Sequence, residues 1–589
     1  SIRRQRQMCI RDRNLKPYWY IAIFSPLFMI AEVLVDLSLP TIMSDIVNNS
    51  IYAGSVSEGM SIVASYGVKM MILVILGGVT GVGAAGFASA ASQSFGNDLR
   101  QDAFAHVMAL SPEQTDKFTV GSLVTRMTND VTMVQNFIAQ GLRSFFRAPI
   151  MFVGGIIMAI SLNIKFGIVI AVSLPIQLLI VYLVMRKIKP MFEQVQDRLD
   201  DVNSVVQENV SGARVVKAYV REEHETKRFD KANGNLFAVM LRVQYIMALL
   251  SPLMMVVMNI AVIAVILIGG IEVGHGAIEV GEVMAVIQYI MQILNSVMMI
   301  STMFQFISRA QASAKRINEV LDCVPTITDG VYEGTGEEEK PGHVVFRSVS
   351  FRYPDTSGEP VLHDIDLDIK SGENLAILGA TGSGKTTLVS LIPRFYNPTE
   401  GEILLDGVNI KDYSLDTLRS KISFVLQKSE LFSGTVAENL RWGDESASDE
   451  ELRETAKVAQ ADEFIMGFAA GYDTMIAEKG ASLSGGQKQR LAIARALLKK
   501  PEVIIFDDSM SALDLATSAK LQKALREKEG TLTVITIAQR VASVMSADRI
   551  LVLDGGTVAA SGSHEELMES SEIYRDIYYS QLKRGEEIE

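Results

Sequence analysis

The sequence has few cysteines: among its 589 residues, only Cys9 and Cys323 occur. Two cysteines so far apart form neither a disulfide framework nor a metal cluster, so the sequence indicates no structural zinc and requires no oxidising compartment. The sequence also lacks an excess of basic residues, since 55 Lys and Arg are outnumbered by 68 Asp and Glu. That balance argues against a nucleic-acid partner, because phosphate backbones select basic surfaces.

Charged residues are scarce over long stretches of the first half. The chain is 48% hydrophobic with a mean hydropathy of +0.23, which predicts that part of it lies in lipid. Six apolar runs have the length of a membrane span, at about 19–43, 62–94, 144–162, 165–185, 246–270 and 283–306. The sequence therefore predicts a membrane domain over residues 1–325, a linker over 326–342 and a compact, water-soluble α/β domain over 343–589.

The N-terminal residues do not form a signal peptide by this reading. The first apolar run is too long, and it carries Glu32 and Asp36 where a cleavage site with small residues would be expected. A retained membrane helix fits better. We assign no role to the arginine-rich string at residues 3–13.

Basic residues are absent from two loops, 44–61 and 271–282, whereas the long polar segments 95–143 and 186–245 contain many of them. Cytoplasmic segments of membrane proteins carry an excess of Lys and Arg. We therefore expect a multi-pass protein of the cell membrane, with its N-terminus, both polar segments and its C-terminal half in the cytoplasm. A polar segment of some sixty residues, folded as a helical hairpin, would reach roughly 40 Å beyond the membrane at about 1.5 Å per residue.

Polar side chains inside the apolar runs mark a possible substrate cavity, because lipid would penalise them. These residues include Glu32, Asp36, Asn259, Gln288, Gln292 and Asn295. For the amides, hydrogen bonds between helices explain the pattern at least as well as ligand contact does. For the two carboxylates we expect a cavity wall with a cationic or proton-linked role. Methionines crowd the last two runs, which suits varied ligands, although methionine more commonly fills a core.

A glycine-rich stretch, Gly379–Thr386 (GATGSGKT), lies between the apolar runs Leu375–Leu378 and Thr387–Leu391. This order predicts a strand, a loop and the start of a helix. In the pattern of Gly, four residues, Gly, Lys and Ser or Thr, backbone N–H groups and a helix N-terminus wrap a polyphosphate. The Lys of the pattern contacts the outer phosphates, and the Ser or Thr hydroxyl binds Mg²⁺. The alternative is an ordinary glycine-rich turn, which the full pattern in this context disfavours.

A second stretch in this half, Val503–Asp508 (VIIFDD), predicts a buried parallel strand that ends in a carboxylate. Such a strand would deliver Asp507 to the edge of the sheet where a Mg²⁺ beside the phosphate loop would lie. Tyr353 is predicted on a short strand followed by a turn, where its ring could stack on a nucleobase. By itself, Tyr353 is better explained as a solvent-facing aromatic residue of a strand.

The ordered set of phosphate loop, LSGGQ at Leu483–Gln487, VIIFDD and SALD at Ser511–Asp514 resembles the nucleotide-binding domain of ABC transporters. LSGGQ is the signature of that family. Six spans ahead of one such domain resemble the half-transporter exporters, and the resemblance covers nearly the whole chain. It implies an α-helical membrane domain with long cytoplasmic extensions, joined to an α/β P-loop nucleotide-binding domain of ABC type. It also implies a dimer in which each ATP lies between the phosphate loop of one chain and the LSGGQ of the other.

The resemblance also implies ATP and Mg²⁺ as cofactors and assigns residues to them. Tyr353 would stack on adenine, and Mg²⁺ would be bound by Thr386, Gln427 and Asp507. The phosphates would be held by Gly379, Ala380, Thr381, Gly382, Ser383, Gly384, Lys385, Thr386 and Thr387. The partner's ATP would be capped by the signature residues Leu483, Ser484, Gly485, Gly486 and Gln487, and the D-loop would contain Ser511 and Asp514. The turns near Gln114–Phe118 and Ala218–His224 would be coupling helices that dock on the nucleotide-binding domains.

Two positions depart from the family pattern. The family's catalytic glutamate is replaced by Asp508, and its γ-phosphate-contacting histidine is replaced by Gln539. Withdrawing a carboxylate by one methylene can cost on the order of a hundredfold in rate, and Gln donates a hydrogen bond but carries no positive charge. The signature is intact. The sequence therefore predicts one half of a heterodimeric exporter whose own ATP site is degenerate, with tolerated variation in a homodimer as the alternative.

The transported substrate is the least constrained feature. Methionine-rich spans favour small amphipathic drug-like compounds or lipids, with peptides as an alternative. A different hypothesis is a nucleotide-sensing regulatory subunit that gates another protein without net transport. A soluble DNA-repair ATPase with a similar signature is excluded by the six spans.

Overall fold

The computed structural model describes residues 19–586 except 52, 54, 335–340, 354, 355, 357 and 528–531. The arginine-rich string at residues 3–13 lies outside the described residues, as does part of the linker predicted at 326–342. The chain forms two compact units. The helical unit comprises Ser1–Met108 and Val120–Cys323, and the α/β unit comprises Ala109–Thr119 and Val324–Glu589.

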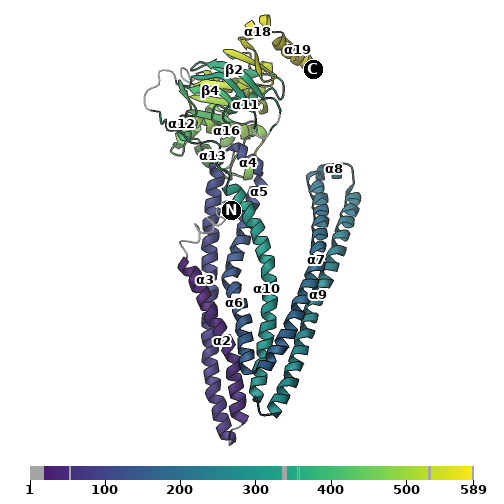
Figure 1. The fold of residues 1–589 in the computed structure, drawn as a ribbon. Coiled ribbons are helices and arrows are strands. Elements are labelled where there is room, and N and C mark those ends of the chain that lie inside the picture. The colour runs from purple at the N-terminus through teal and green to yellow at the C-terminus, as the bar shows by residue number, and fades with distance from the viewer. Residues whose placement is uncertain are drawn as a thin grey trace. The chain divides into compact units, whose positions relative to one another are not determined.

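The helical unit is built from six long helices (Figure 1). They are α2 (Trp19–Ile51), α3 (Val56–Ala109), α6 (Val131–Leu162), α7 (Ile164–Ser211), α9 (Glu222–Gly274) and α10 (Val280–Leu321). Short helices α5 (Val120–Thr125) and α8 (Ala213–Ala218) lie between them, with a π-helical turn, η2 (Arg126–Asp130). Six described helices are long and apolar enough to span a membrane, which confirms the number of spans predicted from the sequence.

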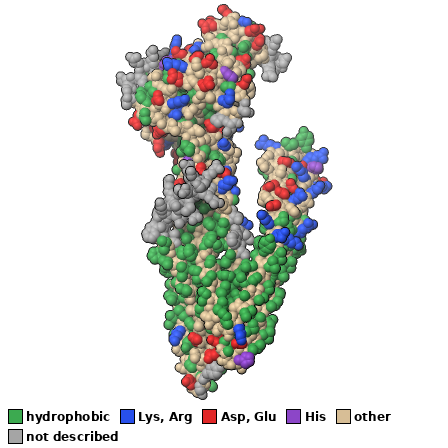
Figure 2. Space-filling model, viewed as in Figure 1, with side chains coloured by type: hydrophobic (Ala, Val, Ile, Leu, Met, Phe, Trp, Pro, Cys, Tyr) green, Lys and Arg blue, Asp and Glu red, His purple; other side chains and the backbone are tan. Residues whose placement is uncertain are grey.

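The long helices continue well beyond their apolar runs. Helices α3, α7 and α9 contain 54, 48 and 53 residues, whereas about 20 residues suffice to cross a bilayer. Figure 1 shows α7 and α9 as a hairpin that α8 closes. Apolar side chains gather over the apolar parts of these helices, while Lys and Arg cluster toward α8 (Figure 2). The unit therefore has an apolar belt with charged extensions at one end.

Helices α2 and α10 pack together within the buried core of the helical unit. Val33, Val286 and Tyr289 are fully buried there. Pro40 lies inside α2 and has no N–H to donate to the Asp36 carbonyl four residues earlier. Helix α10 supplies donors to this part of α2: Tyr289 donates its hydroxyl to the Leu37 carbonyl at 2.7 Å, and Gln292 lies 3.4 Å from the Asp36 carbonyl.

The α/β unit contains two main sheets. One has the order β2–β1–β4–β5 and is antiparallel, with strands β1 (Val344–Phe351), β2 (Leu362–Ile369), β4 (Glu400–Leu405) and β5 (Val408–Asn409). The other has the order β12–β11–β3–β10–β9–β6. Its strands are β3 (Asn374–Leu378), β6 (Ile422–Val425), β9 (Val503–Asp507), β10 (Thr533–Ile537), β11 (Arg549–Asp554) and β12 (Thr557–Gly562). All neighbours in this sheet are parallel except β12, which pairs antiparallel with β11.

Short helices and a small ribbon complete the α/β unit. The ribbon pairs β7 (Gly434–Thr435) with β8 (Met475–Ile476). The helices are α11 (Lys385–Ser390), α12 (Leu415–Lys421), α13 (Val436–Arg441), α14 (Asp449–Val458), α15 (Asp462–Met466), α16 (Gly485–Leu498), α17 (Leu515–Glu527), α18 (His564–Ser570) and α19 (Glu572–Glu586). Together they bury the apolar faces of the parallel sheet.

Helix α4 (Pro112–Phe118) groups with the α/β unit although it precedes η2 and α6 in the chain. Ser111 and Gln114 form a capping box at its start. Gln114 is buried, and its Nε2 donates to the Val324 carbonyl at 2.7 Å. Burial raises the pKa of Tyr396, and the carboxylates of Glu113 and Asp116 add to that rise. The turn predicted near Gln114–Phe118 is thus a helix that lies beside the sheet domain.

Candidate functional site

Three parallel strands of the six-stranded sheet bring their carboxyl ends to one edge. Strand β10 lies between β3 and β9, and Ile537 at the end of β10 is opposite Asp507 at the end of β9. The glycine-rich loop follows β3 directly. Ligands of open α/β sheets bind at this edge, so the topology places the residues after β3, β9 and β10 around one site.

The loop Gly379–Thr386 has the backbone of a phosphate cradle. Gly379 has φ +153°, and a Cβ there would lie 2.2 Å from the Leu553 carbonyl oxygen. Gly384 has φ +95°, and a Cβ there would lie 2.8 Å from the Leu362 side chain. Only glycine fits both positions. The loop then enters α11, whose N-terminal N–H groups face the cradle in the arrangement that favours anions.

Two side chains of the loop are suited to a polyphosphate. The buried Lys385 ammonium donates to the Gly379 and Ala380 carbonyls at 2.8 and 2.7 Å. Burial lowers the pKa of Lys385, while Asp508 and Asp507 act in the opposite direction. The Ser383 hydroxyl is buried without a hydrogen-bond partner among the described residues, and a buried polar atom without a partner indicates that one is supplied by a ligand or water. The residues present therefore fit bound phosphates.

The carboxylate predicted for Mg²⁺ lies beside the loop hydroxyl. Thr386 Oγ1 donates to Asp507 Oδ1 at 2.8 Å. Asp507 is buried, and burial raises its pKa, with Asp508 adding to the rise and the Thr386 hydrogen bond and Lys385 opposing it. A divalent cation prefers such oxygen ligands, so Thr386 and Asp507 fit a magnesium ion next to the phosphates.

Asp508 follows β9 and is held by two amides from other parts of the chain. Gln427 Nε2 donates to Asp508 Oδ2 at 3.0 Å, and Gln539 Nε2 donates to the same oxygen at 2.7 Å. The backbone of Asp508 is left-handed, with φ +47°, a conformation that is uncommon for residues other than glycine. Both departures from the family pattern therefore meet in one hydrogen-bonded group, Gln427–Asp508–Gln539.

Tyr353 lies two residues beyond the end of β1, not on the strand as predicted. Its ring packs edge-to-face against Phe351 and Tyr396, with centroids 5.0 and 5.4 Å apart. Its hydroxyl lies 3.0 Å from Thr387 Oγ1, the residue that follows the phosphate loop. This position beside the loop is compatible with the predicted contact to adenine.

The LSGGQ residues lie at the start of α16. Ser484 caps the helix: its side chain accepts from Gln487 N, and Gln487 Oε1 accepts from Ser484 N. Leu483 packs against the buried cluster behind the helix, whereas Ser484 and Gly485 are exposed. In the SALD stretch, Ser511 Oγ donates to the Asp508 carbonyl at 2.7 Å. The neighbouring Asp514 caps α17 by accepting from the N–H and hydroxyl of Thr517 at 2.8 and 2.7 Å.

Known proteins resemble this chain over most of its length. Residues 22–297 match the family described as the ABC transporter transmembrane region, and residues 362–511 match the family described as ABC transporter. An uncharacterized ABC transporter ATP-binding protein of Bacillus subtilis, YfiB, is 39% identical over 97% of this chain and 98% of its own length. The chain belongs to the ABC transporter family.

Two further comparisons extend the match. An ATP-dependent lipid A-core flippase of Desulfotalea psychrophila is 34% identical to this ABC transporter over 83% of the chain and 85% of its own length. The solved structure of a bacterial Atm1-family ABC exporter with ATP bound shares its fold, with a TM-score of 0.80. That match has 24% sequence identity and covers 96% of this chain and 98% of that one. The α/β unit thus contains an ATP-binding, ATP-hydrolysing domain, and the helical unit contains the membrane domain.

In the helical unit of the transporter, Glu32 and Asp36 share an ion-pair partner that was not predicted from the sequence. Arg147 of α6 forms an ion pair with Glu32, and its Nη2 lies 3.0 Å from Asp36 Oδ2. All three side chains line a cavity of about 370 Å³ beside Gly77 and Gly81 of α3. The signal that could have found Arg147 was its place within an apolar run, where a charge requires a counter-ion.

The four amides predicted for the substrate cavity divide into two groups. Gln292 directs its Nε2 toward the Asp36 carbonyl of α2 at 3.4 Å, while its Oε1 is buried without a hydrogen-bond partner among the described residues. Asn259, Gln288 and Asn295 are exposed on the helices of this single chain. On α10, the last two share one face with exposed methionines, and the face consists of Met284, Gln288, Met291, Asn295 and Met299. We call this face the α10 stripe.

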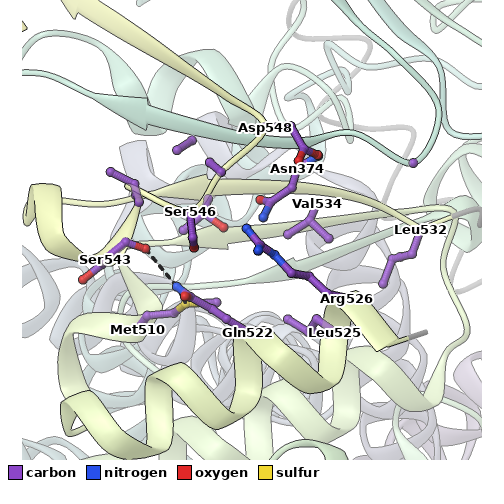
Figure 3. A pocket seen from close by; sticks show the side chains of 15 residues that line it. Asn374, Met510, Gln522, Leu525, Arg526, Leu532, Val534, Ser543, Ser546 and Asp548 are labelled. Carbon is purple, nitrogen blue, oxygen red and sulfur yellow. Dashed lines mark hydrogen bonds between the residues drawn. The ribbon is translucent and has the colours of Figure 1, made fainter. Parts of the chain in front are cut away.

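In the α/β unit, a cavity of about 290 Å³ lies between α17 and the parallel sheet (Figure 3). Gln522 of α17 lies in its wall. Its Nε2 donates to the Ser543 carbonyl at 2.8 Å and approaches Met510 Sδ at 3.7 Å. Ser543 follows Gln539 by four residues, so α17 is tied to the segment that leaves the ATP site.

Proposed function

We propose that this chain is one subunit of an ATP-driven exporter that moves small amphipathic compounds or lipids out of the cytoplasm, and that its own ATP site hydrolyses slowly. The observation that carries the second part is the Gln427–Asp508–Gln539 group. The Asp508 side chain is one methylene shorter than that of glutamate, and the two amides orient its carboxylate in this withdrawn position. General-base efficiency depends steeply on geometry, so Asp508 is a poor activator of water.

The residues of the site act together in this proposal. Lys385, the loop N–H groups and the Ser383 hydroxyl bind and orient the phosphates, and Tyr353 positions the base. Thr386 and Asp507 hold Mg²⁺, and Gln427, the third residue predicted for the ion, donates to the neighbouring Asp508. Bound ATP and Mg²⁺ supply the free energy and the transferable phosphoryl group. Gln539 donates a hydrogen bond where the family's histidine would also carry charge.

An intact signature favours a two-chain assembly. Ser484 and Gly485 are exposed at the start of α16, where a helix N-terminus suits a phosphate. A chain that keeps this surface while weakening its own hydrolytic positions fits a heterodimer. In that heterodimer, the competent site consists of the partner's phosphate loop and this chain's LSGGQ. The partner would be a second half-transporter with glutamate and histidine at the positions of Asp508 and Gln539.

Transport requires that the ATP domains move the membrane helices. Helix α4 belongs to the α/β unit through Gln114, and α8 carries exposed Val215 with Tyr219 and Val220 just beyond it, 61%, 74% and 80% exposed. Such an apolar tip suits docking on another chain. We propose both as coupling helices on the cytoplasmic side, in agreement with the Lys and Arg that cluster toward α8 (Figure 2).

The proposed substrate class rests on the α10 stripe and on a recess of about 130 Å³ between α6 and α10. Phe137, Phe145, Met303 and Phe306 contribute to the lining of the recess. Aromatic and methionine side chains adapt to varied apolar ligands, and their mixture with Gln288 and Asn295 suits amphipathic molecules. The lipid A-core flippase among the relatives acts on a lipid, which agrees with this class.

The test is ATP hydrolysis by the purified full-length chain in lipid nanodiscs, compared with the variant Asp508→Glu/Gln539→His. We expect feeble turnover by the natural chain and an increase of about a hundredfold in the variant, the size of effect that an ångström of misplacement can have. Strong turnover by the natural chain alone would contradict the degenerate site and favour a homodimeric exporter.

The second candidate, a nucleotide-sensing subunit without net transport, is favoured by the same slow site. Vesicles that contain the chain and its partner separate the two functions. ATP-dependent accumulation of an amphipathic dye supports the exporter, whereas a nucleotide-gated conductance without accumulation supports the sensor.

A further inference from the structure

The segment that carries Gln539 is held from outside by the C-terminal helix. Gln581 of α19 donates its Nε2 to the Gln539 carbonyl at 2.8 Å, and its Oε1 accepts from the Val541 N–H at 2.9 Å. Val541 begins a single 3₁₀ turn, Val541–Ser543, whose first N–H groups have no partner within the turn. One side chain therefore satisfies a carbonyl and an N–H on either side of Arg540.

These contacts continue into the ATP site. The same residue whose carbonyl Gln581 binds, Gln539, donates its side chain to Asp508 Oδ2 at 2.7 Å. Helix α19 is anchored independently, since Tyr574 is fully buried and its hydroxyl lies 2.6 Å from His564 Nδ1. The contact between Gln581 and Gln539 therefore joins a fixed helix to a residue of the site.

A cavity of about 320 Å³ separates α19 from the phosphate loop at the same place. Its walls include Gly379 and Thr381 of the loop, Gln539, and the side chains Ile573, Ile577 and Gln581 of α19. Helix α19 is thus not packed directly against the loop across this gap. The two hydrogen bonds of Gln581 provide a polar connection across this region.

We propose that Gln581 is a positioning residue for ATP hydrolysis at this site, acting through Gln539 on Asp508. The inference rests on the proposed nucleotide site but goes beyond it, because it assigns a role to the C-terminal helix. With Gln581 in place, the Gln539 backbone is fixed on two sides and its amide is directed at Asp508. Without Gln581, the backbone at residues 539–541 loses both hydrogen bonds, and the Gln539 side-chain amide is no longer held in position to donate to Asp508.

The test is a double-mutant cycle on the full-length chain in nanodiscs, read as single-turnover hydrolysis of radiolabelled ATP over hours. We expect Gln581→Ala and Gln539→Ala each to lower the rate about tenfold, within the range reported for small misplacements of catalytic groups. Because Gln581 acts through Gln539, the double variant should fall within about twofold of Gln539→Ala alone. ATP affinity and the melting temperature should stay near those of the natural chain.

Three further variants make the test specific. Gln581→Glu keeps the acceptor for Val541 N–H and should fall between the natural chain and Gln581→Ala. Ser580→Ala, which removes only a hydroxyl bonded to the Ile577 carbonyl at 2.9 Å, should leave the rate unchanged. Gln522→Ala loosens the same segment at Ser543, on the far side from Gln539, and should have a smaller effect than Gln581→Ala.

Multiplicative effects in the double variant, or equal effects of Gln522→Ala and Gln581→Ala, would overturn the inference, because both would indicate general bracing of the segment. No effect of Gln581→Ala while Gln539→Ala lowers the rate would overturn it as well. A chain that fails to bind ATP would instead contradict the proposed nucleotide site, and fast turnover by the natural chain would contradict only the proposal of a degenerate site.

Discussion

Carboxylates with unusual partners occur in both units of the molecule, and their partners differ in kind. In the α/β unit, Asp508 accepts from two neutral amides, Gln427 and Gln539. In the helical unit, Glu32 and Asp36 share the charged guanidinium of Arg147. The first group is arranged around a ligand site, where the partners of a carboxylate control its chemistry. The second group lies within membrane helices, where a charged side chain requires a counter-ion.

The largest effect that would sharpen this comparison is expected from Arg147→Met. The variant leaves two carboxylates without their counter-ion, and removal of one partner from a buried ion pair typically costs about 3–5 kcal/mol. We expect a loss of folding free energy of that order, measured by thermal unfolding in detergent. The variant Glu32→Gln/Asp36→Asn/Arg147→Met should recover most of the loss, because no unpaired charge remains.

A matched control lies at another ion pair of the same unit. Lys227 Nζ is 2.7 Å from Glu223 Oε1, and both side chains are exposed, by 72% and 85%. Exposed pairs contribute about 1 kcal/mol or less, so Lys227→Met should have a much smaller effect than Arg147→Met. If the two variants were equally stable, the group of Glu32, Asp36 and Arg147 would not be a compensated intramembrane cluster, and its carboxylates would be free for another role.

The next effect concerns ligand contact in the α/β unit. Tyr353→Ala should weaken ATP binding about tenfold, because stacking of a base on an aromatic ring is worth about 1–3 kcal/mol. Tyr353→Phe keeps the ring and loses only the contact with Thr387, so its affinity should stay near that of the natural chain. Binding of a fluorescent ATP analogue to the full-length chain measures both. Equal weakening in the two variants would assign the effect to the hydroxyl instead of the ring.

The two units also differ in how much their sequence reveals. In the α/β unit, the phosphate loop, Asp507 and LSGGQ follow a fixed order that predicts their arrangement, because each motif is tied to the end of a strand or the start of a helix. The prediction that Tyr353 lies on a strand was wrong by two residues, because the hydrogen-bonded strand ends at Phe351. The role of Gln581 could not be predicted, because it depends on where the C-terminal helix packs.

In the helical unit, hydropathy predicts the number of spans, since each apolar run must be long enough to cross lipid. Hydropathy does not predict which neighbouring helix a side chain faces, because an apolar helix can rotate about its axis without any change in its hydropathy. The sequence therefore marked Glu32 and Asp36 but not their contact with Arg147, which lies 111 residues from Asp36. It also leaves open whether Gln292 packs against α2 or binds a ligand, because the carbonyl that its amide approaches belongs to Asp36, four residues before Pro40 in another helix.

The smallest expected effect concerns the contact of α10 with the same part of α2. Tyr289 is fully buried and donates its hydroxyl to the Leu37 carbonyl at 2.7 Å, with Thr41 Oγ1 also 2.7 Å away. Hydrogen bonds between membrane helices are worth about 0.6 kcal/mol on average, so Tyr289→Phe should lower the free energy of unfolding by roughly that amount. Transport of an amphipathic dye should not change, because the hydroxyl serves α2 and not the cavity. A loss of transport without a loss of stability would instead place Tyr289 among the residues that contact substrate. Polar groups of the helical unit would then, like those of the α/β unit, serve a ligand and not only helix packing.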